Sequence, residues 1–179
     1  MTKKNDVFFA IKGKKIDGNR FVSEALKKKS CLAIVNRKNI NYPKSKQIKV
    51  DNTLNFLTKC SSIFRENINA KIISITGSCG KTTLKEMIGL TLKRLSKTTY
   101  SPKSFNNKYG VPLSLFNLKQ NDEFGVFEVG MDKKGEIDYL TKIIKPDLGV
   151  ITNISYAHSK NFKNINQIAE AKAEIINNI

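Results

Sequence analysis

Short apolar runs alternate with amphipathic helical patterns along most of the chain. In the second part of the chain, the apolar runs are 72–75, 98–100, 125–129 and 148–152. Each of them is expected to form a strand. The helical patterns between them are 84–95, 112–118 and 136–144. Strands that alternate with helices favour a parallel sheet built from right-handed crossovers. The pattern therefore predicts a parallel-sheet α/β domain over residues 71–179.

Two of these helices carry further signals. Apolar residues recur at helical spacing in 84–95 and predict one buried stripe. Its members are Leu84, Met87, Ile88, Leu92 and Leu95. Pro112 suits the first position of the next helix, where a missing N–H costs nothing.

The first seventy residues show the same alternation on a smaller scale. Their apolar runs are 7–11, 31–35 and 47–50, with a helical stretch near 22–29. Asp51 and Asn52 are good N-cap residues for a second helix, and the polar segment 66–69 is expected to be a linker. The sequence therefore predicts a small mixed α/β domain over residues 1–70, followed by the domain 71–179.

A glycine turn links the first strand of the second domain to a helix. It reads Thr76-Gly77-Ser78-Cys79-Gly80-Lys81-Thr82-Thr83. Glycines let backbone amides approach an anion, a helix N-terminus favours negative charge, and Lys81 adds a mobile cation, so we expect a nucleotide's phosphates here. The Thr82 hydroxyl could hold Mg²⁺. Only two residues separate the glycines, against four in the general P-loop, so an ordinary strand-to-helix turn stays as the alternative.

Further polar residues follow the other strands. In an open α/β sheet, ligands bind beyond the carboxyl ends of the strands. Glu128 lies near the end of one apolar strand and would be costly to bury unpaired. Glu128 with the Thr82 hydroxyl and a phosphate oxygen would suit Mg²⁺, and a carboxylate that faces solvent is the alternative.

Two more residues are candidates on weaker grounds. His158, the one histidine, follows the last strand on the same edge, although a lone histidine is more often structural. Lys172 interrupts the apolar face of the final helix. Such a lysine either extends its ammonium to water or is held near a site with a lowered pKa, and the pattern alone favours the first reading.

Composition restricts the function without defining it. The formal net charge is +17 and the pI is about 9.8, but lysines occur in every segment, so we expect no nucleic-acid partner. The three cysteines have no metal-ligand or redox spacing, and no early apolar run is long enough for a signal peptide or a membrane span. We therefore expect a cytoplasmic protein.

Taken together, the motifs resemble those of the Mur ligases. The matching segments are Ile75–Thr83, Asn106-Asn107, Gly110–Leu113, Phe127–Met131, Gly135–Ile137, Pro146-Asp147, Ile151–Ile154, Ala157-His158 and Ala171–Ile175. The start of the chain, with Asp6–Ala10 and Asp17-Gly18, is similar to the family's first domain. The resemblance covers nearly the whole chain, and the family's short glycine loop explains the unusual glycine spacing.

The resemblance implies a fold and an activity. The fold would be a small mixed α/β domain that binds a UDP-linked substrate, followed by a partial P-loop parallel-sheet ATPase domain. Family members use ATP to phosphorylate a carboxylate and let an amine attack the acyl phosphate. The similarity is to members that join UDP-N-acetylmuramoyl-tripeptide to D-alanyl-D-alanine, which would make these two molecules the partners of a monomeric enzyme in peptidoglycan precursor synthesis.

The resemblance also implies roles for individual residues. ATP would contact Gly77, Ser78, Cys79, Gly80, Lys81, Thr82, Thr83, Asn106 and Asn107. One Mg²⁺ would be held by Thr82 and Glu128, and a second by His158 with a carbamylated Lys172. Lys81, His158 and Lys172 would be the catalytic residues, and carbamylation requires a neutral amine.

The chain departs from the family pattern at a few positions and in length. Ser104 stands where an asparagine is usual, Asp132 replaces another asparagine, and Ser159-Lys160 follow His158 where Leu-Glu is frequent. Because family members are longer, we expect a piece of such a ligase. The alternatives are a diamino-acid-adding or folylpolyglutamate-type ligase, a basic P-loop module that binds nucleotide or nucleic acid without ligase activity, and an inert truncation product.

Overall fold

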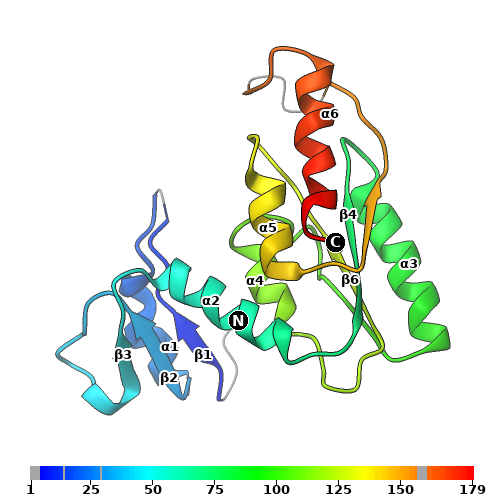
Figure 1. The fold of residues 1–179 in the computed structure, drawn as a ribbon. Coiled ribbons are helices and arrows are strands. Elements are labelled where there is room, and N and C mark those ends of the chain that lie inside the picture. Colours follow the sequence, from blue (N-terminus) through cyan, green and yellow to red (C-terminus); the bar gives the residue numbers. More distant parts are fainter. Residues whose placement is uncertain (1–4, 14, 29, 157–160) are drawn as a thin grey trace. The chain divides into compact units, whose positions relative to one another are not determined.

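The computed structural model describes residues 5–13, 15–28, 30–156 and 161–179 (Figure 1). The chain divides into two compact units, Met1–Cys60 and Ser61–Ile179, which are described one at a time. Each unit contains one parallel sheet. The predicted α/β class with parallel sheets is therefore confirmed. In the described part of the chain, no helix has the length and apolar character needed to cross a membrane.

The first unit is a three-stranded sheet with short helices. Its elements are β1 (Val7–Phe9), η1 (Gly18–Phe21), α1 (Val22–Lys27), β2 (Leu32–Val35), η2 (Lys44–Lys46), β3 (Gln47–Lys49) and the start of α2 (Thr53–Glu66). The strands lie in the order β1-β2-β3. Ala10, Val22 and Ala33 belong to its buried core. The Asn52 side chain accepts the amides of Leu54 and Asn55 at 3.0 and 2.9 Å, which confirms the predicted cap of α2.

The second unit is an open parallel sheet covered by helices. Its elements after α2 are β4 (Lys71–Thr76), α3 (Lys81–Leu95), β5 (Thr98–Tyr100), α4 (Gly110–Leu115), β6 (Phe124–Glu128), α5 (Glu136–Ile144), β7 (Leu148–Ile151), α6 (Ile165–Ala173) and η4 (Glu174–Asn178). The strand order is β5-β6-β4-β7. Helix α3 covers one face, and α4 and α5 cover the other (Figure 1). The ends of β4 and β6 therefore lie side by side, which brings their polar residues together.

The main core lies between the sheet and the face that carries α4 and α5. Ile72 and Phe127 from the strands pack with Leu115, Ile137 and Ile144 from the helices, and all five are fully buried. Burying each of these side chains stabilises the fold by about 1.5–3 kcal/mol. This core fixes β6, and with it Glu128 at the strand's end.

Helix α3 packs on the sheet differently from the prediction. The expected apolar stripe is wrong, because Met87 is 61% exposed and Leu95 is 79% exposed. The fully buried positions are Lys85 and Gly89. A side chain at position 89 would collide with the ring of Tyr100, at 2.6 Å from its nearest atoms. The helix therefore approaches β5 closely at a glycine, while Leu84, Ile88 and Leu92 are only half-buried.

Two helices also begin earlier than the pattern predicted. Helix α3 starts at Lys81 instead of Leu84, directly after Gly80, which adopts a positive φ of 76°. Helix α4 starts at Gly110, so that Pro112 is its third residue. The proline is still tolerated, because the first turn of a helix leaves its amides without intrahelical acceptors.

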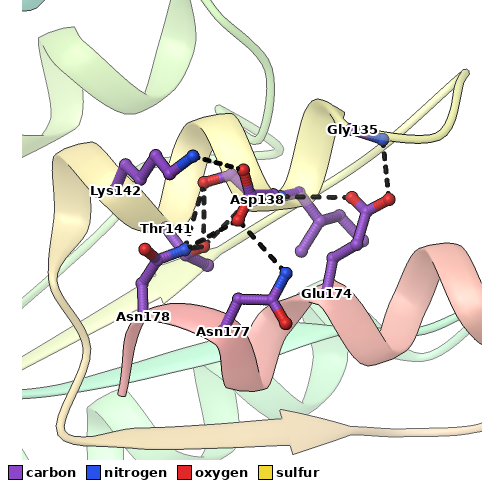
Figure 2. Close-up of polar contacts among 8 residues, drawn as sticks. Gly135, Asp138, Thr141, Lys142, Glu174, Asn177 and Asn178 are labelled. Atoms are coloured by element: carbon purple, nitrogen blue, oxygen red, sulfur yellow. Dashed lines mark hydrogen bonds and ion pairs between the residues drawn. The ribbon is translucent and has the colours of Figure 1, made fainter.

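The C-terminal segment is fixed to α5 by a carboxylate (Figure 2). The Glu174 carboxylate accepts the backbone amides of Gly135 at 2.7 Å and Asp138 at 3.2 Å, both at the start of α5. The side chain of Asn178 donates to the Thr141 hydroxyl at 2.9 Å. A negative charge at a helix N-terminus is stabilising. These contacts hold the segment that follows α6 and Lys172 against α5.

Candidate functional site

The glycine turn between β4 and α3 has a shape that depends on its glycines. Gly77 has a φ of +146°, and a Cβ there would lie 1.8 Å from the Thr152 hydroxyl oxygen. Gly80 adopts a φ of +76° and faces open space. Both backbone conformations are ones that side-chain-bearing residues rarely adopt. The turn can therefore follow the end of β4 closely and lead directly into α3.

The turn is fixed by residues that follow β7. The amides of Ser78 and Cys79 donate to the carbonyl and side-chain oxygens of Asn153, at 3.0 and 3.1 Å. The Thr152 hydroxyl donates to the carbonyl of Cys79 at 2.6 Å. These two amides therefore donate their hydrogen bonds within the protein. The amides at the start of α3, from Lys81 onward, are the ones that an anion could reach.

Lys81 lies over this turn. Its ammonium donates to the carbonyls of Gly77 at 2.7 Å and Ser78 at 3.3 Å. A flexible lysine in this position can exchange carbonyl contacts for a phosphate at small cost. The structure thus places the lysine where the sequence predicted a phosphate ligand.

Glu128 and Thr82 meet at the ends of β6 and the turn. The Thr82 hydroxyl donates to one carboxylate oxygen of Glu128 at 2.7 Å, and the Asn106 amide donates to the other at 2.7 Å. The Ser104 hydroxyl lies 3.3 Å from that of Thr82. Glu128 is only 1% exposed, so it is not a carboxylate that faces solvent. Strands and loops distant in sequence therefore converge on this carboxylate.

The pair of oxygens from Thr82 and Glu128 fits a magnesium ion by its chemistry. Mg²⁺ is held by one or two protein oxygens together with phosphate and water oxygens. Among the described residues, no group of three or more His, Cys, Asp and Glu side chains could hold a metal ion. A single carboxylate with a hydroxyl is consistent with an ion that takes most of its ligands from a nucleotide.

Lys172 lies in a buried position of α6. It is 2% exposed, so its side chain does not extend to water as the sequence pattern alone favoured. Burial, together with the smaller effect of the Lys81 charge, lowers the pKa of its amine to about 8. A neutral, nucleophilic amine is therefore accessible near physiological pH.

The remaining predicted site residues occupy varied positions. Asn107 accepts the amides of Tyr109 and Gly110 at 3.0 Å each, and so begins α4. Thr83 is exposed in the first turn of α3. His158 lies outside the described residues. Sequence reasoning missed Lys85, because nothing in the local pattern distinguishes it from the solvent-facing lysines of the same helix.

The fold and the site define a parallel α/β domain with a glycine turn between a strand and a helix, and comparison with known proteins gives its family. Residues 75–179 match the model of the Mur ligase middle domain. The chain belongs to the Mur ligase family.

Several relatives with a common name are similar to the whole chain. The UDP-N-acetylmuramoyl-tripeptide--D-alanyl-D-alanine ligase of Buchnera aphidicola subsp. Acyrthosiphon pisum is 42% identical over 97% of this chain and 38% of its own length. The ligase of that name from Bacillus subtilis is 36% identical over 98% of this chain and 38% of its own length. The chain thus spans less than two fifths of the length of these relatives.

Solved structures of proteins named MurF are also similar to this chain. A crystal structure of MurF from Acinetobacter baumannii superposes with a TM-score of 0.90 at 37% identity, over 99% of this chain and 39% of that one. MurF ligase from Thermotoga maritima, in complex with ADP, gives a TM-score of 0.85 at 35% identity, over 98% of this chain and 40% of that one. The identity in both cases is high enough to support homology as well as a shared fold.

Proposed function

We propose that this chain provides the nucleotide-binding part of an ATP-dependent ligase that joins D-alanyl-D-alanine to UDP-N-acetylmuramoyl-tripeptide. The terminal phosphoryl group of ATP goes to the peptide carboxylate, and the incoming amine displaces phosphate to form the amide. The observation that carries the proposal is the Thr82–Glu128 pair beside the glycine turn, in a chain that relatives of that name match almost throughout. The enzyme would work as a monomer in the cytoplasm, in peptidoglycan precursor synthesis.

The phosphates of ATP would lie at the N-terminus of α3. Lys81 would release its contacts to Gly77 and Ser78 and turn to the phosphates, and the first amides of α3 would point at them. Ser78, Cys79 and Gly80 would shape the turn. Asn106 and Asn107 would hold the adjoining loop, with Asn106 keeping Glu128 in place. Positioning and charge neutralisation are the main means of catalysing phosphoryl transfer.

Thr82 and Glu128 would hold one Mg²⁺, which neutralises negative charge on the phosphates when it is bound. Lys172, as a carbamate, and His158 would hold a second ion. The lowered pKa of Lys172 supports this role, because a carbamate forms only from the neutral amine. We assign residues 1–70 to binding of the UDP-linked substrate and residues 71–179 to binding of ATP.

A chimeric enzyme tests the proposal. Residues 1–179 would replace the matching segment of the Bacillus subtilis relative, and phosphate release from ATP would be measured with each acceptor present or omitted. We expect release that requires both UDP-N-acetylmuramoyl-tripeptide and D-alanyl-D-alanine and that is lost in Lys81→Ala. The matched control is Lys93→Ala, which alters an exposed lysine of the same helix. Release driven by a different amino acid would refute the proposed acceptor.

A further inference from the structure

Lys85 is a buried lysine that the proposed mechanism does not use. It lies in α3 one turn beyond Lys81 and is 0% exposed. Its ammonium donates to the carbonyls of Ser101 and Lys103, each at 2.7 Å, and lies 2.8 Å from a carboxylate oxygen of Glu86. An ammonium has three protons. Two of these protons are therefore accepted by carbonyls and the charge is paired with Glu86, which offsets the cost of burying it.

The two carbonyls belong to the loop between β5 and α4. They flank Pro102, and the second comes from Lys103, whose φ of +50° is unusual for a residue with a side chain. A backbone turn of this kind persists only where its surroundings hold it. Lys85 provides that support from both sides of the turn.

The same loop carries polar side chains to the candidate site. Ser104, directly after the turn, lies beside Thr82, and Asn106 donates to Glu128. The backbone of Asn106 also accepts the amide of Gly130 at 2.7 Å. The ammonium of Lys85 and the hydroxyl of Thr82 thus come from one helix and act on one loop.

We propose that Lys85 is a positioning residue that sets the loop 101–106 so that Ser104 and Asn106 hold Thr82 and Glu128 in the geometry for magnesium-bound nucleotide. The inference rests on the proposed nucleotide site and adds a residue to it. Stability alone gives no reason for a charge at this position, because buried ions can often be replaced by apolar residues without loss of stability. An apolar side chain cannot donate hydrogen bonds to two carbonyls, as Lys85 does.

Nucleotide binding by the full chain tests this role. The affinity for ADP with a fluorescent label on its ribose would be measured at increasing MgCl₂ concentrations and, separately, in EDTA. Both measurements would be made for wild type and Lys85→Met. Because the chain contains no tryptophan, Phe105→Trp adds a reporter of the loop that works without nucleotide. The matched control is Lys93→Met, which removes an equal charge from an exposed position of the same helix.

We expect Lys85→Met to raise the Mg²⁺ concentration at half-saturation about 10-fold, the scale of losing support around a metal ligand. Affinity in EDTA should change less than about 2-fold, because Lys81 and the α3 amides remain. In the Phe105→Trp background, the indole emission should shift to the red and become more accessible to acrylamide, while Lys93→Met behaves as wild type.

Other results would overturn the inference. An unchanged Mg²⁺ midpoint and an unchanged indole emission would show that Lys85 does not set the loop, and equal losses with and without Mg²⁺ would show a role in folding alone. If Lys85→Met does not fold, Pro102→Gly loosens the same turn with Lys85 intact, and an unchanged midpoint there contradicts the proposal. Wild type that binds no nucleotide in any condition would instead refute the proposed function, while the indole emission of the Phe105→Trp reporter still tests Lys85.

Discussion

Two lysines are buried among the described residues of the second unit, and their surroundings differ. Lys85, between α3 and the loop after β5, donates to two carbonyls and pairs with the carboxylate of Glu86. Lys172, in α6, has a pKa lowered to about 8 by burial and by the charge of Lys81. Both side chains are almost completely hidden from water. Two buried lysines therefore differ in their neighbours, which suits Lys85 to support a loop and, under the proposed function, suits Lys172 to form a carbamate.

The strongest test of this contrast is to remove the Lys172 amine. In the chimeric ligase, Lys172→Met should lower the rate of phosphate release at least about 100-fold, as removal of one charge-stabilising group does in other active sites. The labelled ADP should still bind to the 179-residue chain, because Lys81 and α3 are unchanged. Steady-state rates check the expected loss of activity, and the binding titration checks that nucleotide still binds. A fully active Lys172→Met enzyme would remove Lys172 from the mechanism.

The pH dependence of carbamate formation sharpens the contrast further. At constant dissolved ¹³CO₂ the neutral fraction of Lys172 grows as pH rises through about 8, so its carbamate signal should be weak at low pH and increase across this value. ¹³C NMR of the chain checks the profile. The signal should disappear in Lys172→Met and remain in Lys85→Met. The assignment fails if the signal survives the loss of Lys172.

The strand and turn that form the site could be predicted because their signals are local. An apolar strand, two glycines and a Lys-Thr pair lie close together in the sequence, and they located the strand-to-helix turn and Thr82 correctly. Glu128 also lies at the end of its strand, as expected. Whether these residues bind ATP and Mg²⁺ stays a prediction.

Features that depend on distant residues could not be predicted. The amides of Ser78 and Cys79 are taken by Asn153, which lies far along the chain. Lys85 is buried only because the loop after β5 folds over it. The stripe expected in α3 failed for the same reason, since the Gly89 contact with Tyr100 is set by tertiary packing.

A smaller effect is expected from the carboxylate that holds the Lys172 region in place. Glu174→Gln leaves a neutral amide where a carboxylate accepts two amides of α5, so it should lower the free energy of unfolding by about 2 kcal/mol (Figure 2). Urea denaturation measures this change. Glu170→Gln, which alters an exposed carboxylate one turn earlier, in α6, is the control. Equal effects of the two changes would contradict a special role for Glu174.

The smallest effect is expected from a lysine that is not buried at all. Lys134 pairs with Glu170 at 2.9 Å, and both side chains are well exposed. Because water and salt screen such pairs, Lys134→Ala should shift the melting temperature by no more than about 2 °C. A thermal scan at low and high salt checks this, and a large shift would show that exposure is a poor guide to the role of lysines in this chain.

The two glycines of the turn between β4 and α3 are restricted in different ways. Gly77 is restricted twice, by its backbone angle and by the Thr152 hydroxyl that occupies the space of a Cβ, so a smaller residue at 152 would relieve only one restriction. Gly80 shares the positive φ but has open space beside it, and asparagine tolerates that backbone region. The fold itself therefore restricts position 77 more than position 80, where the proposed phosphates would supply the second restriction.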